Sequence, residues 1–267
     1  MSGCSGSCSS CSHAGCAGFV KDRRGVKRII AVGSGKGGVG KSTVTALCAV
    51  ALRRQGLSVG VLDADLTGPS IPNLLGVTAR PLVDENEKII PSVSSTGIGV
   101  MSASLVLEDN RQPVVWRGPM ITGVIKQFWQ DVVWQGLDCL LIDLPPGTAD
   151  APITVLQMIP VDGLLAVTTP QSLAATIVQK QIALAQMLQV PLLGLVENMS
   201  YTVCPHCGEV WEPLGSSHRE AIEKNYGVKT VARVPMDPKL TALSDAGRLE
   251  EYQNGDLEAQ LREAFGL

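Results

Sequence analysis

The fold is decided by the stretch Gly35-Lys36-Gly37-Gly38-Val39-Gly40-Lys41-Ser42, which satisfies the pattern G-x-x-x-x-G-K-[ST]. An apolar run at residues 28–32 precedes it, and a run at residues 41–54 with helix-compatible spacing follows it. Glycines let the backbone turn so that its N–H groups face phosphate oxygens, and the N-terminus of the following helix adds positive potential. The pattern therefore predicts a nucleotide site within a strand, loop and helix.

Each polar residue of this loop has an expected task. Lys41 would neutralise the charge of the β- and γ-phosphates of ATP, and the hydroxyl of Ser42 would be a ligand of Mg²⁺. We expect the nucleotide to be bound by the whole loop, namely Gly35, Lys36, Gly37, Gly38, Val39, Gly40, Lys41, Ser42 and Thr43.

The rest of the chain alternates between short apolar runs and helix-compatible stretches. The 267 residues are 45% hydrophobic but only 4% aromatic, so the core must consist mainly of Val, Leu, Ile and Ala, as in parallel strands buried on both faces. We predict an α/β fold, a mostly parallel, doubly wound P-loop NTPase sheet with helices on both faces and ligands at the carboxyl ends of its strands. The expected strands are 28–32, 59–63, 97–102, 139–143, 163–168, 192–198 and 229–234; the expected helices are 41–54, 119–133, 151–158, 172–189, 217–226, 239–246 and 256–267.

Charge and hydropathy argue against two classes of partner. The formal net charge of −3 provides no broad basic surface, so we expect no nucleic-acid partner. No stretch approaches the roughly 18–20 apolar residues that a membrane span needs, and the N-terminus lacks an apolar signal region. We therefore expect a cytoplasmic protein with no membrane partner.

The second lysine of the loop carries a family resemblance. Lys36 together with residues 37–43 resembles the deviant Walker A loop of the MinD/ParA/NifH-type ATPases. The resemblance implies a face-to-face homodimer in which Lys36 of one subunit reaches the nucleotide of the other, where its charge would stabilise the transition state as an arginine finger does. The alternative is a solvated lysine at the tip of a loop.

Two carboxylate segments fit the same resemblance. Asp63-Ala64-Asp65 resembles switch I, in which Asp65 would orient or deprotonate the attacking water and Asp63 would support the site or cap the next loop. The segment 140–148 resembles a Walker B strand that runs into switch II, with Asp143 near Mg²⁺. The resemblance thus implies Lys36, Lys41 and Asp65 as catalytic residues.

The base of the nucleotide has two candidate contacts. Asn198 follows a predicted strand, and Pro235 follows the next one. In related ATPases an asparagine at this position binds adenine, and the later loop closes over the base. Asn198 as an ordinary turn residue remains an alternative.

Cys204-Pro205-His206-Cys207 places two thiols directly after the Asn198 strand. Two thiolates supply half of a four-coordinate site. Two chains that meet across a two-fold axis would supply four, enough for one 4Fe-4S cluster. Zinc is the alternative metal, with His206 as an added ligand.

At this point the chain resembles the Mrp/ApbC-type iron–sulfur carrier ATPases over residues 27–249. The resemblance also includes Asp65-Leu66-Thr67-Gly68-Pro69-Ser70-Ile71-Pro72 and Trp116-Arg117-Gly118-Pro119-Met120. It implies an ATPase that binds a 4Fe-4S cluster at a dimer interface and transfers it to apo-proteins. The rivals are a positioning ATPase of the MinD/ParA type and a zinc-bridged regulatory ATPase.

Residues 1–24 form a Ser-, Gly- and Cys-rich segment ahead of an ATPase domain at residues 25–267. Almost no apolar side chains occur in this segment, so it is predicted to be flexible. It resembles the additional N-terminal cluster site of eukaryotic-type members, although its first spacing is shorter. Zinc, with His13 as a further ligand, and no metal at all are the alternatives. The four candidate ligands are Cys4, Cys8, Cys11 and Cys16, whereas Cys48 and Cys139 are expected to be ordinary buried thiols.

Overall fold

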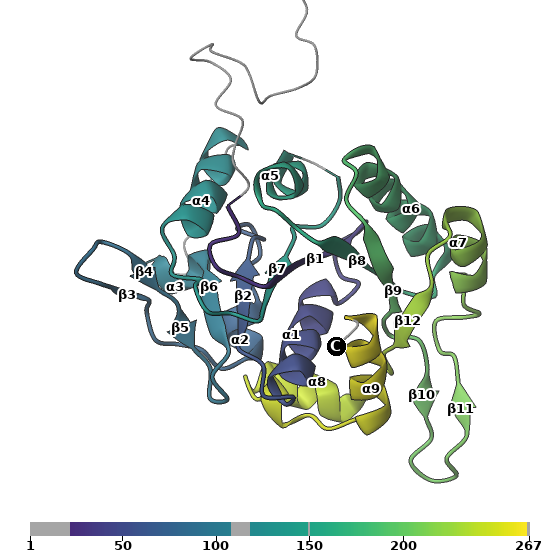
Figure 1. Ribbon diagram of the computed structural model, residues 1–267. Coiled ribbons are helices and arrows are strands. Elements are labelled where there is room, and N and C mark those ends of the chain that lie inside the picture. The colour runs from purple at the N-terminus through teal and green to yellow at the C-terminus, as the bar shows by residue number, and fades with distance from the viewer. Residues whose placement is uncertain (1–21, 108–117, 149, 266–267) are drawn as a thin grey trace, which may run out of the picture.

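A mostly parallel central sheet organises the computed structural model, which describes residues 22–107, 118–148 and 150–265 (Figure 1). The strand order within the described residues is β12-β9-β8-β1-β7-β2-β6-β5, and only the edge strand β5 is antiparallel to its neighbour. The strands are β1 (Arg28–Ser34), β2 (Val59–Asp63), β5 (Ser92–Val93), β6 (Gly99–Ser102), β7 (Cys139–Asp143), β8 (Gly163–Thr168), β9 (Leu192–Glu197) and β12 (Thr230–Arg233).

Helices cover both faces of this sheet (Figure 1). One face packs against α1 (Lys41–Arg53), α2 (Ile71–Leu74), α8 (Pro238–Asp245) and α9 (Gly255–Ala264), and the other against α4 (Gly118–Gln130), α5 (Asp150–Met158), α6 (Ser172–Met187) and α7 (Arg219–Tyr226). Two short elements, α3 (Ala103–Val106) and the 3-10 turn Leu249–Glu251, complete the helices. Within the described ranges no helix has the length and apolarity to cross a bilayer.

Strand β1 shows why the sequence specifies two layers of helices. Its side chains alternate between the faces, so Ile30 and Val32 join the core under α1, whereas Ile29 and Ala31 join the core under α4 and α5. A strand buried on both faces must be apolar at every position, which is the continuous run seen in the sequence. The predicted doubly wound α/β fold is confirmed.

The shortest elements were not predicted. They are the edge strand β5, the helices α2 and α3, and two hairpins, one formed by β3 (Leu82–Val83) and β4 (Ile89–Ile90) and the other by β10 (Thr202–Val203) and β11 (Val210–Trp211). Strands of two residues and helices of a single turn are too short to establish a hydrophobic period. The 3-10 turn Leu249–Glu251 was not predicted either. The remaining elements agree with the predicted ranges to within three residues, and β1 continues two residues further, to Ser34.

Two arginines just before the predicted boundary at residue 25 contact the ATPase domain. Arg23 donates two hydrogen bonds of 2.7 Å to the carboxylate of Asp162, and the guanidinium of Arg24 donates to the carbonyl of Gln130. The end of the predicted cysteine-rich segment is therefore held against the domain by Arg23 and Arg24. The candidate ligands Cys4, Cys8, Cys11 and Cys16, and also Trp116 and Arg117, lie outside the described residues.

Candidate functional site

The phosphate loop lies between β1 and α1, at the carboxyl edge of the sheet. Gly38 and Gly40 have φ values of 82° and 77°, which side chains rarely adopt. Gly35 is required for another reason, because a Cβ there would lie 2.4 Å from the backbone carbonyl of Ile177 in α6. The glycines thus serve both the turn of the loop and the close approach of a helix.

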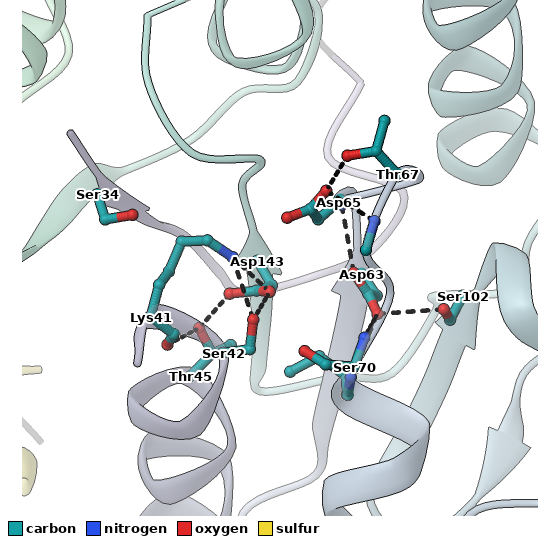
Figure 2. A network of polar contacts seen from close by, with 12 residues as sticks. Ser34, Lys41, Ser42, Thr45, Asp63, Asp65, Thr67, Ser70, Ser102 and Asp143 are labelled. Atoms are coloured by element: carbon teal, nitrogen blue, oxygen red, sulfur yellow. Dashed lines mark hydrogen bonds and ion pairs between the residues drawn. The ribbon is translucent and has the colours of Figure 1, made fainter. Parts of the chain in front are cut away.

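Asp143, at the end of β7, is the centre of the polar network behind this loop (Figure 2). Its Oδ2 atom lies 2.6 Å from Nζ of Lys41 and 2.6 Å from Oγ of Ser42, while its Oδ1 atom accepts a 2.7 Å hydrogen bond from Thr45. Asp143 and Lys41 are both buried. The structure therefore brings together the predicted Walker A lysine, the predicted magnesium ligand and the Walker B carboxylate.

Asp63 anchors the segment that follows β2. Its Oδ2 atom accepts hydrogen bonds from the backbone N–H groups of Ser70 and Ile71 and from the hydroxyl of Ser102, and its Oδ1 atom accepts one from the N–H of Asp65 (Figure 2). Of the two roles considered for Asp63, capping the next loop is the one that these contacts describe.

Asp63 and Asp143 also influence each other electrostatically, because they are register partners on adjacent parallel strands. Burial, and after it the charge of Asp143, raises the pKa of Asp63 to about 7. A cation beside the two carboxylates would offset this repulsion, which suits the site to a magnesium nucleotide.

Asp65 and Lys36 line a cavity of about 280 Å³ together with the phosphate loop. Asp65 is held by hydrogen bonds to its Oδ1 atom from the hydroxyl of Thr67 and the N–H of Gly68 (Figure 2). The side chain of Lys36 is exposed at the edge of this cavity. A carboxylate fixed by two donors and an exposed lysine thus face the same space as the loop.

A second cavity, of about 870 Å³, continues the first one and shares Gly40, Thr43 and Leu74 with it. Its walls include both predicted base contacts, Asn198 and Pro235. The amide nitrogen of Asn198 donates a 2.8 Å hydrogen bond to the carbonyl of Val39, so this side chain supports the phosphate loop directly. The two cavities form one groove across the carboxyl ends of the strands.

The turn between β10 and β11 carries Cys204 and Cys207. Cys207 is exposed and Cys204 is partly exposed. Hydrogen bonds from the backbone N–H groups of Cys207 and His206, and from the Cys207 thiol, lower the pKa of the Cys204 thiol. Cys204 therefore ionises more easily than an ordinary thiol, and the thiolate is the form that binds metals. Cys48 and Cys139 are fully buried in the core, as expected, and burial raises the pKa of both thiols.

Several residues of the site were missed at the sequence level. Thr45 lies one helical turn after Lys41, so the helical period alone places both side chains on the face of α1 that meets Asp143. Trp211 lines the larger cavity, and Arg233 joins Ser200 to Glu212, but both depend on the short hairpin that was not predicted.

Comparison with known proteins places this arrangement in a family. The family model ParA, described as NUBPL iron-transfer P-loop NTPase, matches residues 25–265. An iron–sulfur cluster carrier protein of Methanocaldococcus jannaschii is 47% identical over 83% of this chain and 77% of its own length. A protein of Drosophila grimshawi named cytosolic Fe-S cluster assembly factor Nubp2 homolog is 43% identical over 89% of this chain and 92% of its own length.

Solved structures agree with this placement. A nucleotide-binding protein of Archaeoglobus fulgidus, in complex with ADP and with cobalt found in it, is 44% identical, with a TM-score of 0.76 over 86% of this chain and 90% of that one. The MinD protein of Pyrococcus horikoshii with Mg-ADP has a TM-score of 0.66 at 23% identity over 89% of this chain and 95% of its own, and so shares the fold. The chain is a P-loop ATPase, and it belongs to the ParA-type family of iron-transfer P-loop NTPases.

Proposed function

We propose that this chain is an ATP-dependent iron–sulfur cluster carrier that holds a 4Fe-4S cluster between two copies of itself and transfers it to apo-proteins. The observation that carries the proposal is the pair of accessible thiols, Cys204 and Cys207, on a turn next to the nucleotide groove. The names of the M. jannaschii and D. grimshawi relatives support a role in iron–sulfur chemistry.

The groove fits a magnesium nucleotide. Backbone N–H groups of the glycine loop and the ammonium group of Lys41 would hold the phosphates, and the hydroxyl of Ser42 would bind Mg²⁺. Asp143 already holds Lys41 and Ser42 in place, and it would keep the magnesium side of the site negative. When bound, MgATP would supply the γ-phosphoryl group, and its transfer to water would drive the opening of the proposed dimer.

Other residues that line the groove receive the remaining tasks. Asp65 would orient the attacking water, because two donors already fix its carboxylate at the cavity wall. Lys36 would reach the nucleotide of the partner copy, since its side chain is exposed at the rim and carries a charge that stabilises the phosphoryl transition state. Asn198 and Pro235 would contact the base.

The number of thiols explains why a dimer is part of the proposal. The turn between β10 and β11 supplies two thiolates per chain, and a 4Fe-4S cluster takes four. A two-fold axis beside the turn would bring the same pair from each copy to one cluster. ATP binding would close this dimer and hydrolysis would reopen it, which exposes the cluster to acceptor proteins.

We propose that the protein is located in the cytoplasm. The word cytosolic in the names of the relatives from Drosophila grimshawi and Yarrowia lipolytica supports this location. The formal net charge of −3 supports protein partners rather than nucleic acid.

The experiment that tests the function is anaerobic reconstitution in a background in which Cys4, Cys8, Cys11 and Cys16 are replaced by alanine. This background removes any cluster held by the N-terminal segment. We expect about four iron atoms and four sulfide ions per dimer, an absorption band at about 400 nm, and transfer of the cluster to an apo-protein acceptor. Cys204→Ala/Cys207→Ala should lose both iron and transfer, whereas Cys48→Ala, which removes a buried thiol, should retain them. Normal loading and transfer in the double variant would refute the proposal.

Zinc is the second candidate for the same turn. The observation in its favour is His206, an exposed imidazole between the two thiols. Metal analysis of the anaerobically purified protein separates the two, because a zinc-bridged regulatory ATPase would contain zinc without sulfide and would show no band in the visible region.

A further inference from the structure

The hairpin that carries the cysteines also forms a wall of the nucleotide groove. Thr202 and Trp211 are paired across β10 and β11, and both line the larger cavity. Directly paired residues lie on the same face of a hairpin, and the next pair, Val203 and Val210, lies on the opposite face. One face of the hairpin is therefore turned toward the groove, and the turn with Cys204 lies at its end.

The position of Trp211 within the cavity suits a planar ligand. Among the described residues that line this cavity, Trp211 is the only aromatic one, although 56% of its surface is exposed. Gly40 and Thr43 line the same cavity and also belong to the phosphate cavity. An exposed indole beside a groove that starts at the phosphate loop offers a stacking surface for a base.

The hairpin is tied to the rest of this wall. The N–H of Met236 donates a 2.6 Å hydrogen bond to the carbonyl of Tyr201, and the hydroxyl of Thr202 donates to the carbonyl of Met236. Met236 itself lines the cavity. The start of the hairpin and the loop after β12 are therefore hydrogen-bonded to each other along this wall of the cavity.

A second set of contacts fixes the hairpin to the end of the sheet. Arg233 of β12 donates 2.7 Å hydrogen bonds to the hydroxyl of Ser200 before β10 and to the carboxylate of Glu212 after β11. Ser200 in turn donates to the buried carboxylate of Glu197, next to Asn198. Hydrogen bonds therefore connect the hairpin to Glu197, the neighbour of Asn198, whose side chain bonds the phosphate loop.

We propose that Trp211 contacts the base of the bound adenine nucleotide, so that the hairpin bearing Cys204 and Cys207 is itself part of the nucleotide site. The proposal rests on the proposed function only in placing an adenine nucleotide in the groove. The hairpin would then contact the adenine base and also carry the two thiols. Nucleotide binding and the state of the thiols would therefore affect each other, and the coupling free energy is the same in both directions.

The first test separates the base contact from the phosphate contact. ADP and inorganic pyrophosphate are titrated into the full-length protein and into Trp211→Ala, Trp211→Phe and Val210→Ala. Loss of base stacking should weaken ADP binding about tenfold in Trp211→Ala, while Trp211→Phe keeps most of it. Pyrophosphate affinity should stay unchanged in all variants. Val210→Ala, an exposed apolar change on the other face of the same hairpin, should bind ADP normally. Equal ADP affinity in Trp211→Ala and wild type would overturn the proposal.

The second test measures the coupling without a cluster. The alkylation rates of Cys204 and Cys207 are followed in the metal-free protein with saturating ADP, with pyrophosphate and with neither. ADP should change these rates about fivefold in wild type and in Val210→Ala, and pyrophosphate should not. In Trp211→Ala at saturating ADP the change should disappear; an undiminished change there would overturn the coupling. Neither test uses iron, so a failure of cluster loading would not affect these outcomes.

Discussion

The ammonium nitrogen of Lys41 lies 2.6 Å from Oδ2 of Asp143, and both side chains are buried. Removal of the cation alone leaves a buried carboxylate with only two hydroxyl donors. We therefore expect Lys41→Ala to lower the free energy of unfolding of the nucleotide-free protein by about 3 kcal/mol.

The matched control for this pair is the double variant. Lys41→Ala/Asp143→Ala removes both charges, so it should unfold at a higher urea concentration than Lys41→Ala alone. Urea unfolding followed by circular dichroism measures both variants. A double variant less stable than Lys41→Ala would show that the ion pair is not what Lys41 contributes to stability.

Two glycines of the phosphate loop should respond differently to alanine. Both have positive φ, so each substitution should cost about 1 kcal/mol in backbone strain. At Gly38 nothing lies within 4 Å of the new Cβ, whereas at Gly40 it would lie 2.1 Å from Nδ2 of Asn198. Gly40→Ala should therefore lower the free energy of unfolding by about 1 kcal/mol more than Gly38→Ala, because the Asn198–Val39 hydrogen bond must break. Urea unfolding of the two variants checks the difference, and equal losses would contradict it.

Lys36 should matter for hydrolysis and not for folding. Its side chain is exposed, so Lys36→Ala should leave the thermal midpoint of the nucleotide-free protein unchanged. The ATPase rate should fall about tenfold or more, because a charge on the transferred phosphoryl group is lost. Lys224→Ala, an exposed lysine on α7, is the control. Mixing Lys36→Ala with a subunit that cannot bind ATP tests whether the lysine acts across the dimer.

Alkylation of the metal-free protein should reveal the lowered pKa of Cys204. Because donors from Cys207 and His206 favour the thiolate, the rate at Cys204 should reach half of its maximum at a lower pH than the rate at an unperturbed thiol. The pKa is lowered, so the reactive form persists as the pH falls and is lost only below the shifted value. Cys207→Ala removes one of the donors and should move the profile to higher pH. An unmoved profile, measured by mass spectrometry, would argue against this hydrogen bonding.

Arg233 should be needed for stability at the end of β9. Its guanidinium lies 3.4 Å from the buried carboxylate of Glu197 and also bonds Ser200. Arg233→Ala should lower the free energy of unfolding by about 2 kcal/mol, because Glu197 keeps only hydroxyl donors. Arg248→Ala removes an exposed ion pair to Glu251 and should leave stability close to that of wild type. Similar losses in the two variants, in urea unfolding, would contradict the assigned role.

The main sheet and the phosphate loop could be predicted because their signals are local. Strand β1 has an apolar run buried on both faces, and the glycine pattern that follows it is specific in itself. Asp143 ends β7 and Lys41 begins α1 at the same edge of the sheet, but their contact was not predicted, because Asp143 was expected near Mg²⁺. The long strands and the phosphate-binding role of the loop can thus be predicted from single stretches of sequence.

The rest of the site depends on contacts between distant residues. Asp63 anchors its loop partly through Ser102, and Gly35 is required by the backbone of Ile177. No local pattern encodes either neighbour. The hairpin around Cys204 has strands of two residues, which establish no period, so its Trp211 could not be placed against the groove.

The β10–β11 hairpin pairs with no strand of the central sheet and is inserted between β9 and α7. The parallel strand pairs do not include the hairpin, so replacement of its turn would leave them in place. The proposed metal-binding turn is therefore a short insertion at the edge of the nucleotide groove. Under the proposed function, replacement of this turn with the Thr202–Trp211 pair kept would change which metal the ATPase binds without removing the proposed base contact.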